Sequence, residues 1–473
     1  MIWVHLVGHF VLLFLMGYYL ATNLQWYNYK LSRVVLHHHA PWQHLVFFLL
    51  PLFAYIAVRE YVWALDILYG VALYLWQRKI DKKLVFTARI KRFFALIALF
   101  GLLFDTIFLL KGVPLFSTIL PLAAALLVSN GIEKYLFALF QKEAKRKLQR
   151  IDPPIVAVTA SYGKTSIKNF IYQILQEDFR VYKTPRSVNT IAGILKDINE
   201  SLPSDTEIYV AEAGARERGD IFAIAEFLQP HYAVVGKVGE QHIEYFKTLE
   251  NIILTKLEIL KSKRLKKAFI WDGIPIKDRD IFMKFGSNIK NVRESLDGIA
   301  WDLELGGKNY HFQAPILGGF NALNITAAIL VARELGMDMP TIAERVAKLR
   351  SVEHRLQKIE AGGKIIIDDS FNGNLEGMLA SYALVASYNG RKVIVTPGIV
   401  ESTEEANKRL AKKIDEVFDL VIITGKLNKD ILDSVITKPK ILLEDKSKLQ
   451  EVLAEHTKPG DLILFSNDAP SFM

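Results

Sequence analysis

The sequence contains no cysteine among its 473 residues. This absence excludes a disulfide framework, catalysis by a thiol, and metal sites built from thiolates. Charged residues are also scarce, at 23% against 51% hydrophobic residues, which excludes a mainly disordered chain. A chain of this length is expected to form two to four domains with a buried core.

The excess of basic over acidic residues is confined to the first third of the chain. Residues 1–150 carry 17 Lys and Arg but 6 Asp and Glu, whereas the remainder is slightly acidic within a total net charge of +9. A protein that binds nucleic acid usually carries a basic patch on its folded domains. Because the larger part of the chain lacks a basic excess, we expect no nucleic-acid partner.

The first 150 residues are dominated by apolar runs. These runs cover residues 1–21, 43–58, 60–76, 93–110 and 113–129. A membrane-spanning helix needs about 20 mostly apolar residues. The pattern therefore predicts a multi-span transmembrane α-helical region at 1–150. The alternative, a buried helical domain of a soluble protein, would show polar faces at helical spacing.

The loops predict how this region is oriented. Basic residues cluster in segments 77–92 and 142–150. Lys and Arg are enriched in cytoplasmic loops, so five spans would place the N-terminus outside and residues 130–473 in the cytoplasm.

A phosphate-binding loop is predicted where the second part of the chain begins. Residues 155–159 form a short β-branched apolar run, which is typical of a buried parallel strand, and a helical pattern follows at 167–175. Between them lies a Gly-Lys-Thr-Ser sequence, whose lysine would contact nucleotide phosphates and whose threonine would bind Mg²⁺. The predicted phosphate-binding residues are Ser161, Gly163, Lys164, Thr165 and Ser166. The alternative is a polar strand-to-helix turn with a surface lysine.

Further polar residues follow the next predicted strands. Glu212 ends the strand at 208–211, where an open α/β sheet places its ligands, and is a candidate for Mg²⁺ coordination. His242 follows a strand at 232–236, and Lys256 lies in an amphipathic segment. Alone, His242 would more often be structural and Lys256 a solvated helix residue.

The last third alternates short strands with helical patterns. Strands are expected at 364–368, 392–396, 420–424 and 462–465, with helices at 402–417 and 446–453. This alternation predicts a mostly parallel sheet, so the fold class after residue 150 is α/β.

Several motifs in 151–473 resemble the Mur ligase family. They are TASYGKTS at 159–166, VNTIAG at 188–193, AEAGARERGDI at 211–221, GGFNALNITAAI at 318–329, EHRLQ at 353–357 and IIIDDSFNGN at 365–374. The chain is most similar to the MurF type, which adds D-Ala-D-Ala to UDP-muramoyl-tripeptide. The resemblance implies a P-loop Mur ligase central ATP-binding domain at 151–350 and a Rossmann-like C-terminal domain at 351–473.

The resemblance implies ATP and two Mg²⁺ ions as cofactors. Lys164 and Thr165 would hold phosphates and metal, Glu212 and His242 would be metal-associated, and Lys256 matches a lysine that many members carry carbamoylated. Asn321 and Asn324 match residues that contact adenine and ribose, whereas Arg355 and Asp369 match residues that reach the nucleotide from the last domain. The implied substrate contacts are Asn189, Arg216, Asn372 and Asn374, and the implied catalytic residues are Lys164, His242, Lys256 and Arg355.

The implied activity is ATP-dependent amide ligation through an acyl phosphate in peptidoglycan precursor synthesis. The expected location is the bacterial inner membrane, with the ligase portion cytoplasmic, a hinge near 350–357, and other cell-wall synthesis proteins as partners. One departure matters, because membrane helices replace the α/β domain that usually grips UDP. Two alternatives therefore stay open: a membrane-associated Mur-like ligase for a lipid-linked or polyglutamate substrate, and a membrane protein with a nucleotide-binding regulatory domain.

Overall fold

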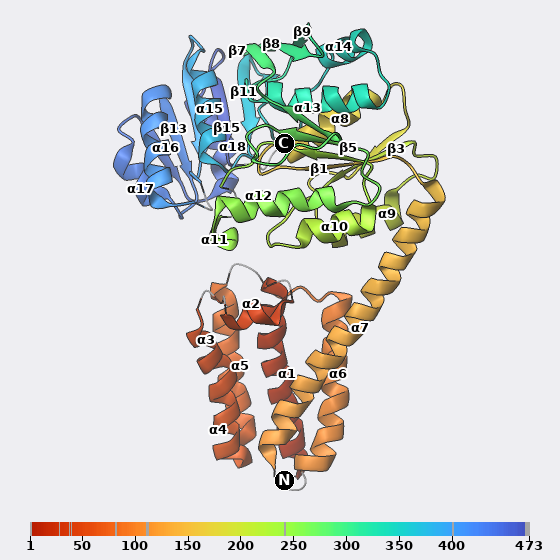
Figure 1. The fold of residues 1–473 in the computed structure, drawn as a ribbon. Coiled ribbons are helices and arrows are strands. Elements are labelled where there is room, and N and C mark those ends of the chain that lie inside the picture. The colour runs from red at the N-terminus through yellow and green to blue at the C-terminus, as the bar shows by residue number, and fades with distance from the viewer. Residues whose placement is uncertain are drawn as a thin grey trace. The chain divides into compact units, whose positions relative to one another are not determined.

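The chain forms two compact units, residues 1–142 and residues 143–473. A computed structural model describes residues 2–27, 29–36, 38, 40–80, 83–109, 113–240, 243–399 and 402–468. Figure 1 colours the first unit from red to orange and the second from yellow to blue. The division at 142/143 falls inside one long helix, α7.

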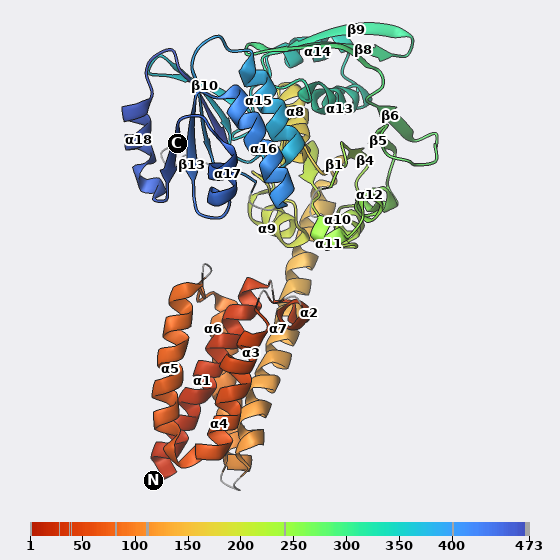
Figure 2. The same cartoon turned by 90° about the vertical axis from the view of Figure 1, so that its left-hand side faces the viewer.

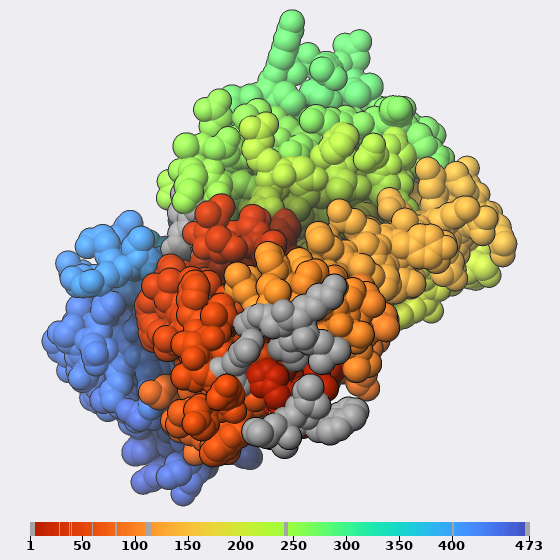
Figure 3. All heavy atoms as spheres, turned by 90° about the horizontal axis from the view of Figure 1, so that it is seen from below, coloured from red at the N-terminus to blue at the C-terminus, as the bar shows by residue number. Residues whose placement is uncertain are grey.

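The described residues of the first unit form helices and their connections. The helices are α1 (Ile2–Trp26), α2 (Leu31–Leu36), α3 (Trp42–His44), η1 (Leu45–Leu49), α4 (Leu50–Val58), η2 (Arg59–Tyr61), α5 (Val62–Lys79), α6 (Ala88–Phe104), η3 (Asp105–Leu109) and α7 (Pro114–Ile151). Leu12, Leu73 and Ile97 belong to their shared apolar core. A Cβ atom on Gly17 would lie 2.5 Å from Ile97 Cδ1, so the missing side chain lets α1 and α6 pack closely. Figure 3 shows the heavy atoms as spheres seen from below, with those of this unit in red to orange.

The five predicted apolar runs fall largely within these helices. Among the described residues, two helices are long and apolar enough to cross a membrane, His5–Trp26 and Leu115–Ile151, and Trp42–Val58 is a shorter apolar helix. The helical prediction for this region agrees with the structure. Insertion into a membrane remains a prediction.

The second unit begins with a six-stranded parallel sheet in the order β2-β3-β1-β4-β5-β6. Its strands are β1 (Ile155–Thr159), β2 (Val181–Lys183), β3 (Ile208–Glu212), β4 (Tyr232–Val235), β5 (Lys267–Trp271) and β6 (Phe282–Phe285). The accompanying helices are α8 (Lys164–Leu175), α9 (Ile191–Ser201), α10 (Asp220–Leu228), α11 (Ile243–Phe246), α12 (Leu249–Leu257) and η4 (Glu258–Lys261). The central strands β1 and β3 are buried along their whole length, which explains their uninterrupted apolar sequences.

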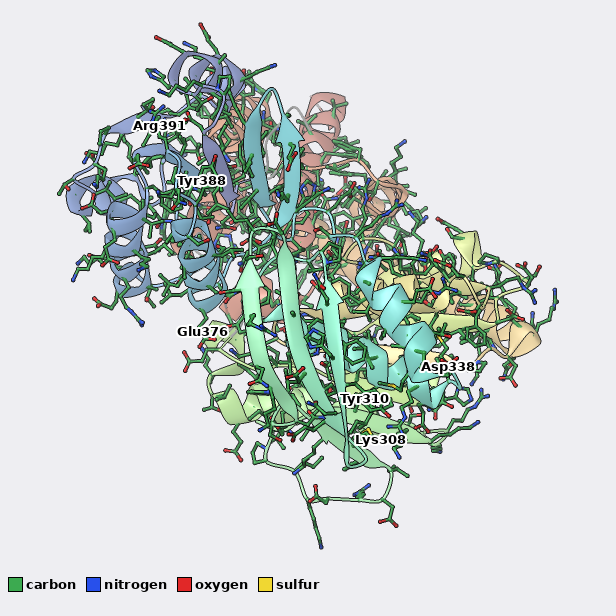
Figure 4. The ribbon with its side chains drawn as sticks, turned by 90° about the horizontal axis from the view of Figure 1, so that it is seen from above. Lys308, Tyr310, Asp338, Glu376, Tyr388 and Arg391 are labelled. Atoms are coloured by element: carbon green, nitrogen blue, oxygen red, sulfur yellow. The ribbon has the colours of Figure 1, made fainter. Side chains whose placement is uncertain are left out.

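A small antiparallel sheet and two helices complete this part. They are β7 (Ile289–Ser295), β8 (Gly298–Leu305), β9 (Lys308–Ala314), α13 (Asn321–Glu334) and α14 (Met339–Ala347). Helices α8 and α13 cover one face of the parallel sheet, while α10 and α12 cover the other (Figure 1). Trp301 of β8 is fully buried in the core that α8 and α13 share. Figure 4 shows the small sheet from above, with Lys308 and Tyr310 labelled on β9.

The last part holds a second six-stranded sheet in the order β10-β11-β15-β12-β13-β14, in which β10 alone is antiparallel to its neighbour. Its elements are β10 (Gln357–Ala361), β11 (Lys364–Asp369), α15 (Leu375–Ala386), β12 (Lys392–Thr396), α16 (Glu404–Val417), β13 (Leu420–Thr424), α17 (Lys429–Val435), β14 (Lys440–Leu443), η5 (Lys446–Lys448), α18 (Leu449–His456) and β15 (Leu462–Ser466). Side chains from α15, α16 and α17 share one core with the strands and α18 another, so helices cover both faces (Figure 2). The predicted α/β class with mostly parallel sheets is confirmed.

Candidate active site

The loop between β1 and α8 has the geometry of a phosphate-binding loop. Gly163 adopts a left-handed conformation, with φ at 82°, directly before the first residue of α8. A Cβ atom on Gly163 would lie 2.4 Å from Asn324 Oδ1. Glycine is therefore required twice, by the backbone angle and by the close approach of α13. This arrangement leaves the N-terminus of α8 available to an anionic ligand.

Lys164 folds over this loop. Its Nζ donates hydrogen bonds to the carbonyl oxygens of Ala160, at 2.9 Å, and Ser161, at 3.1 Å. Burial lowers the pKa of Lys164, the charge of Glu212 opposes this, and the positive charge of Arg355 adds to it, so that the pKa is about 8. The amine thus stays mostly protonated at neutral pH, and its predicted contact with phosphate requires that charge.

Glu212 is the centre of a buried polar cluster at the carboxyl end of β3. Its carboxylate accepts hydrogen bonds from Thr165 Oγ1 at 3.0 Å and from Asn189 Nδ2 at 3.0 Å. A third partner is Lys168, whose Nζ lies 3.1 Å from Glu212 Oε2. The predicted metal residues Thr165 and Glu212 are therefore brought together, and the predicted substrate residue Asn189 joins them.

Lys168 is a residue of this site that the motifs did not identify. Its side chain is fully buried, and its ammonium also donates to the carbonyl oxygen of Arg186. A signal exists in the sequence, because Lys168 follows Lys164 by four residues on α8. Residues at this spacing lie on the same face of a helix. Once Lys164 is predicted to face the strand ends, Lys168 is expected to face them too.

Lys256 lies near the end of α12 and is also buried, with 3% of its surface exposed. Burial lowers the pKa of Lys256 well below its ordinary value, and the charge of Lys164 adds to this, against the opposing effect of Glu212 and Asp220. The structure therefore holds Lys256 within electrostatic reach of the phosphate loop. A lowered pKa favours the neutral amine.

Arg355 and Asp369 enter from the last part of the chain. Arg355 lies in the segment before β10, within electrostatic reach of Glu212 and Asp369, and its Nη1 donates to the carbonyl oxygen of Phe371. Asp369 ends β11 and is 2% exposed. Burial raises the pKa of Asp369 to about 7, against the hydrogen bond from Asn372 and the charge of Arg355. The neighbouring His354 and Leu356 both have positive φ angles, of 61° and 48°.

The loop after β11 is held by its own asparagines. Asn372 Nδ2 donates to Asp369 Oδ2 at 2.8 Å, and Asn374 Nδ2 donates to Asn372 Oδ1 at 2.7 Å. Asn374 Oδ1 also accepts from Gly377 N and caps α15. Both residues lie beside Asp369, and their contact with substrate remains a prediction.

The remaining predicted nucleotide residues surround the loop. Ser161 Oγ donates to the carbonyl oxygen of Gly239, and Ser166 is buried in α8. Asn324 Nδ2 donates to Asn321 Oδ1, and Asn321 Nδ2 donates to the carbonyl oxygen of Leu317. These contacts hold Asn324 against the phosphate loop. Whether the two asparagines contact adenine and ribose remains a prediction.

For two predicted residues, the described contacts show no link to the cluster around Glu212 and the phosphate loop. Arg216 has an exposed side chain, and its backbone N–H donates to Asp220. His242 lies outside the residues that the structure describes. Their proposed roles toward substrate and metal stay predictions.

An ion pair links the loop after β4 with the last part of the chain. Lys237 Nζ lies 3.0 Å from Glu376 Oε2, and the two side chains are 43% and 73% exposed. Lys237 also supplies the carbonyl oxygen that accepts from Ser161 N. Glu376 stands in the first turn of α15 and is labelled in Figure 4. The phosphate loop is thus bordered by both α/β parts of the second unit.

Comparison with known proteins gives the same family at several levels. Residues 158–332 match the Mur ligase middle domain family. The UDP-N-acetylmuramoyl-tripeptide--D-alanyl-D-alanine ligase of Bacillus subtilis is 28% identical over 346 residues, which are 69% of this chain and 75% of the relative. The ligase of the same name from Borreliella burgdorferi is 25% identical, over 65% of this chain and 69% of its own.

Solved structures agree with the sequence matches. The crystal structure of MurF ligase from Thermotoga maritima in complex with ADP is similar with a TM-score of 0.61 and 27% identity, over 70% of this chain and 80% of that chain. A MurF structure from Acinetobacter baumannii has a TM-score of 0.63 over 70% and 77% of the two chains; at 22% identity it supports the fold alone.

Proposed function

We propose that the chain is a MurF-like Mur ligase, which joins D-Ala-D-Ala to UDP-muramoyl-tripeptide and consumes ATP. The observation that carries this proposal is the convergence of Lys164, Thr165, Glu212 and Lys256 around a glycine-containing loop, with Arg355 arriving from the last domain. The tripeptide carboxylate attacks the γ-phosphorus of ATP, which gives an acyl phosphate and ADP. The amine of D-Ala-D-Ala then attacks the activated carbonyl carbon, and phosphate leaves.

The residues of the site supply charge and position for this reaction. Phosphoryl transfer depends chiefly on positioning and on neutralising charge, so no side-chain nucleophile is needed. Lys164 and Arg355, which lie within electrostatic reach of each other, would supply two cations to the phosphates of ATP. Glycine at position 163 would let the backbone approach the phosphates. Because the reaction needs no thiol, the absence of cysteine is compatible with it.

The donors in the site suit Mg²⁺. The Thr165 hydroxyl lies 3.0 Å from the Glu212 carboxylate, and hydroxyl and carboxylate oxygens are the hard ligands this ion prefers. We propose that these two residues hold one ion and that His242 and Lys256 hold a second. The ions would neutralise the negative charge of the phosphates. Lys168 and Asn189 fix the carboxylate of Glu212 so that it faces Thr165.

We also propose that Lys256 is carbamoylated. Only a neutral amine reacts with carbon dioxide, and burial favours that form of Lys256. The carbamate would convert this buried amine into an anionic oxygen ligand, which suits a site with two hard cations.

We propose that the first unit anchors the ligase in the bacterial inner membrane, with the second unit in the cytoplasm. Two observations support this placement. The first is the apolar helices of the first unit, and the second is the pair of basic segments, one after α5 and one after the apolar half of α7. Closure of the last domain over ATP, about the segment 350–357, would keep water from the acyl phosphate. Other cell-wall synthesis proteins are the partners we expect at this membrane.

A product assay tests the proposed reaction. Purified full-length protein is incubated with ATP, Mg²⁺, UDP-muramoyl-tripeptide and D-Ala-D-Ala, and both phosphate and UDP-muramoyl-pentapeptide are measured. A parallel reaction offers a lipid-linked muramoyl tripeptide, because the helical unit stands where a UDP-gripping domain is expected. Pentapeptide on the UDP substrate supports the proposal; turnover of the lipid-linked substrate alone rejects it.

A further inference from the structure

A large apolar cavity runs along α1 and α6 in the first unit. Its volume is about 1030 Å³, at the upper end of the range of about 300–1,000 Å³ for small-molecule sites. Phe10 and Phe14 of α1 and Phe94 of α6 form its wall, and the rings of Phe14 and Phe94 stack with centroids 5.7 Å apart. Nothing in the proposed ligase reaction uses this cavity.

The polar groups of the cavity are separated along its length. Gly17 approaches Ile97 and Gly101 approaches Phe10, so α1 and α6 run in opposite directions. Tyr18 and Lys91, which both line the cavity, therefore lie toward one end. Asp105 lies at the other end of the lining.

Among the described residues that line the cavity, Lys91 is the one charged residue for which no ion pair is found. At the far end, Asp105 lies 2.8 Å from His9 Nδ1, and both side chains are buried. Near the start of α6, Arg89 stacks over the ring of Tyr29 at 3.6 Å and Arg92 pairs with Glu133. Among the described residues Lys91 has no ion pair, although it belongs to the same basic segment.

The length of the cavity suits a lipid chain. Lys91 and Asp105 are fourteen residues apart, which corresponds to about 21 Å along a helix. One leaflet of a bilayer has about half of a hydrocarbon thickness of about 30 Å. The distance from Lys91 to Asp105 therefore exceeds the length that an acyl chain spans in one leaflet, so a chain that starts beside Lys91 can lie within this cavity.

We propose that this cavity, called here the α1–α6 groove, binds an anionic phospholipid. One acyl chain lies against Phe10, Phe14 and Phe94, and the phosphate contacts Lys91 and the hydroxyl group of Tyr18. This inference rests on the proposed membrane location and goes beyond the proposed ligase reaction. Basic pockets between membrane helices on the cytoplasmic side commonly take anionic head groups.

The openness of the rim favours a lipid over a soluble ligand. Val7 and Leu102 line the groove and are 63% and 62% exposed, so its side is apolar and accessible. Sites for soluble ligands usually add several polar groups that fix orientation. Here the middle of the groove has none among the described lining residues, which suits an alkyl chain and a single anionic head.

Lipid retention tests the proposal. Delipidated full-length protein in mild detergent is offered dioleoylphosphatidylglycerol or dioleoylphosphatidylcholine, and the lipid that remains after gel filtration is counted by mass spectrometry. One basic residue that faces anionic lipid changes affinity about fivefold. We therefore expect Lys91→Gln to lower retention of the anionic lipid about fivefold and to leave the zwitterionic lipid unchanged.

Two further variants separate the groove from the general basic surface. Lys79→Gln removes an exposed basic residue at the end of α5 that does not line the groove, and it should leave retention unchanged. Val11→Trp fills the groove and should lower retention of both lipids. Equal losses in Lys91→Gln and Lys79→Gln, or equal retention of the two lipids by the parent, would overturn the proposal. A chain that stays monodisperse without detergent overturns the membrane location itself, whereas the product assay judges the ligase reaction separately.

Discussion

Replacing Lys168 by methionine should strongly destabilise the second unit. Lys168 and Glu212 form an ion pair at 3.1 Å whose side chains are 0% and 1% exposed. Removing this cation breaks the ion pair and leaves the buried carboxylate with hydrogen bonds from the neutral donors Thr165 and Asn189. Conversely, Glu212→Gln leaves a buried ammonium group beside a neutral amide.

The size of the effect follows from the burial of the pair. Breaking a buried ion pair on one side costs about 3–5 kcal/mol, whereas replacing both partners by neutral groups is often close to neutral. A loss of 1 kcal/mol lowers the melting temperature of a domain of this size by about 2–4 °C. Each single variant should thus melt at least about 6 °C below the parent. The double variant Lys168→Met/Glu212→Gln should recover most of that loss.

Differential scanning fluorimetry of the purified full-length variants measures these shifts. The matched control is Lys196→Met/Glu200→Gln on α9, a pair at 3.8 Å whose side chains are 66% and 57% exposed. Exposed pairs contribute about 0–1 kcal/mol. The variants Lys196→Met and Glu200→Gln, alone and combined, should therefore melt close to the parent. A double Lys168/Glu212 variant no more stable than the worse single would refute the argument that the charges compensate each other.

Three further predictions concern individual residues of the site. Lys164→Ala should lower the rate of phosphate release at least about a hundredfold, because it removes a charge aimed at the transferring phosphate; an unchanged rate would mean the loop is misassigned. The parent incubated with ¹³C-labelled bicarbonate should show a carbamate signal that Lys256→Arg lacks, and identical spectra would contradict carbamoylation. Burial raises the pKa of Asp369 from 3.8 to about 7. Between these two pH values the folded chain holds a proton on Asp369 that the unfolded chain has released, and this proton binding stabilises the fold. Its contribution to stability should be lost as pH rises through about 7; Asp369→Asn should flatten the melting-temperature profile between these values, and a parallel profile would count against the pKa shift.

Local patterns carried most of the correct predictions. The strand, glycine turn and helix around Lys164 could be predicted because a buried strand, a Gly-Lys-Thr sequence and a helix start are adjacent along the chain. Glu212 could be predicted because parallel strands present the residues at their carboxyl ends to the same edge of a sheet. In each case the position of a residue relative to one strand decides where its side chain lies.

Contacts between distant segments were not predictable in the same way. The sequence does not say that Asn324 stands against Gly163, because that contact depends on how α13 packs on α8. The small sheet β7–β9 was missed, although the Asp297-Gly298 and Gly306-Gly307 turns between alternating segments are typical of hairpins. The burial of Lys168 was missed because lysine is mostly found in contact with solvent.

The ion pair between Lys237 and Glu376 has a consequence for the release of products. Because both side chains are largely exposed, the pair contributes little to holding the two α/β parts together, and dissolved salt weakens it further. This pair therefore does not hold the two parts closed by itself, and other contacts contribute, such as the packing of Leu317 in the core of the last part. If the last domain closes over ATP as proposed, we expect Lys237 and Glu376 to separate easily when it opens again, so that this pair does not slow the release of product.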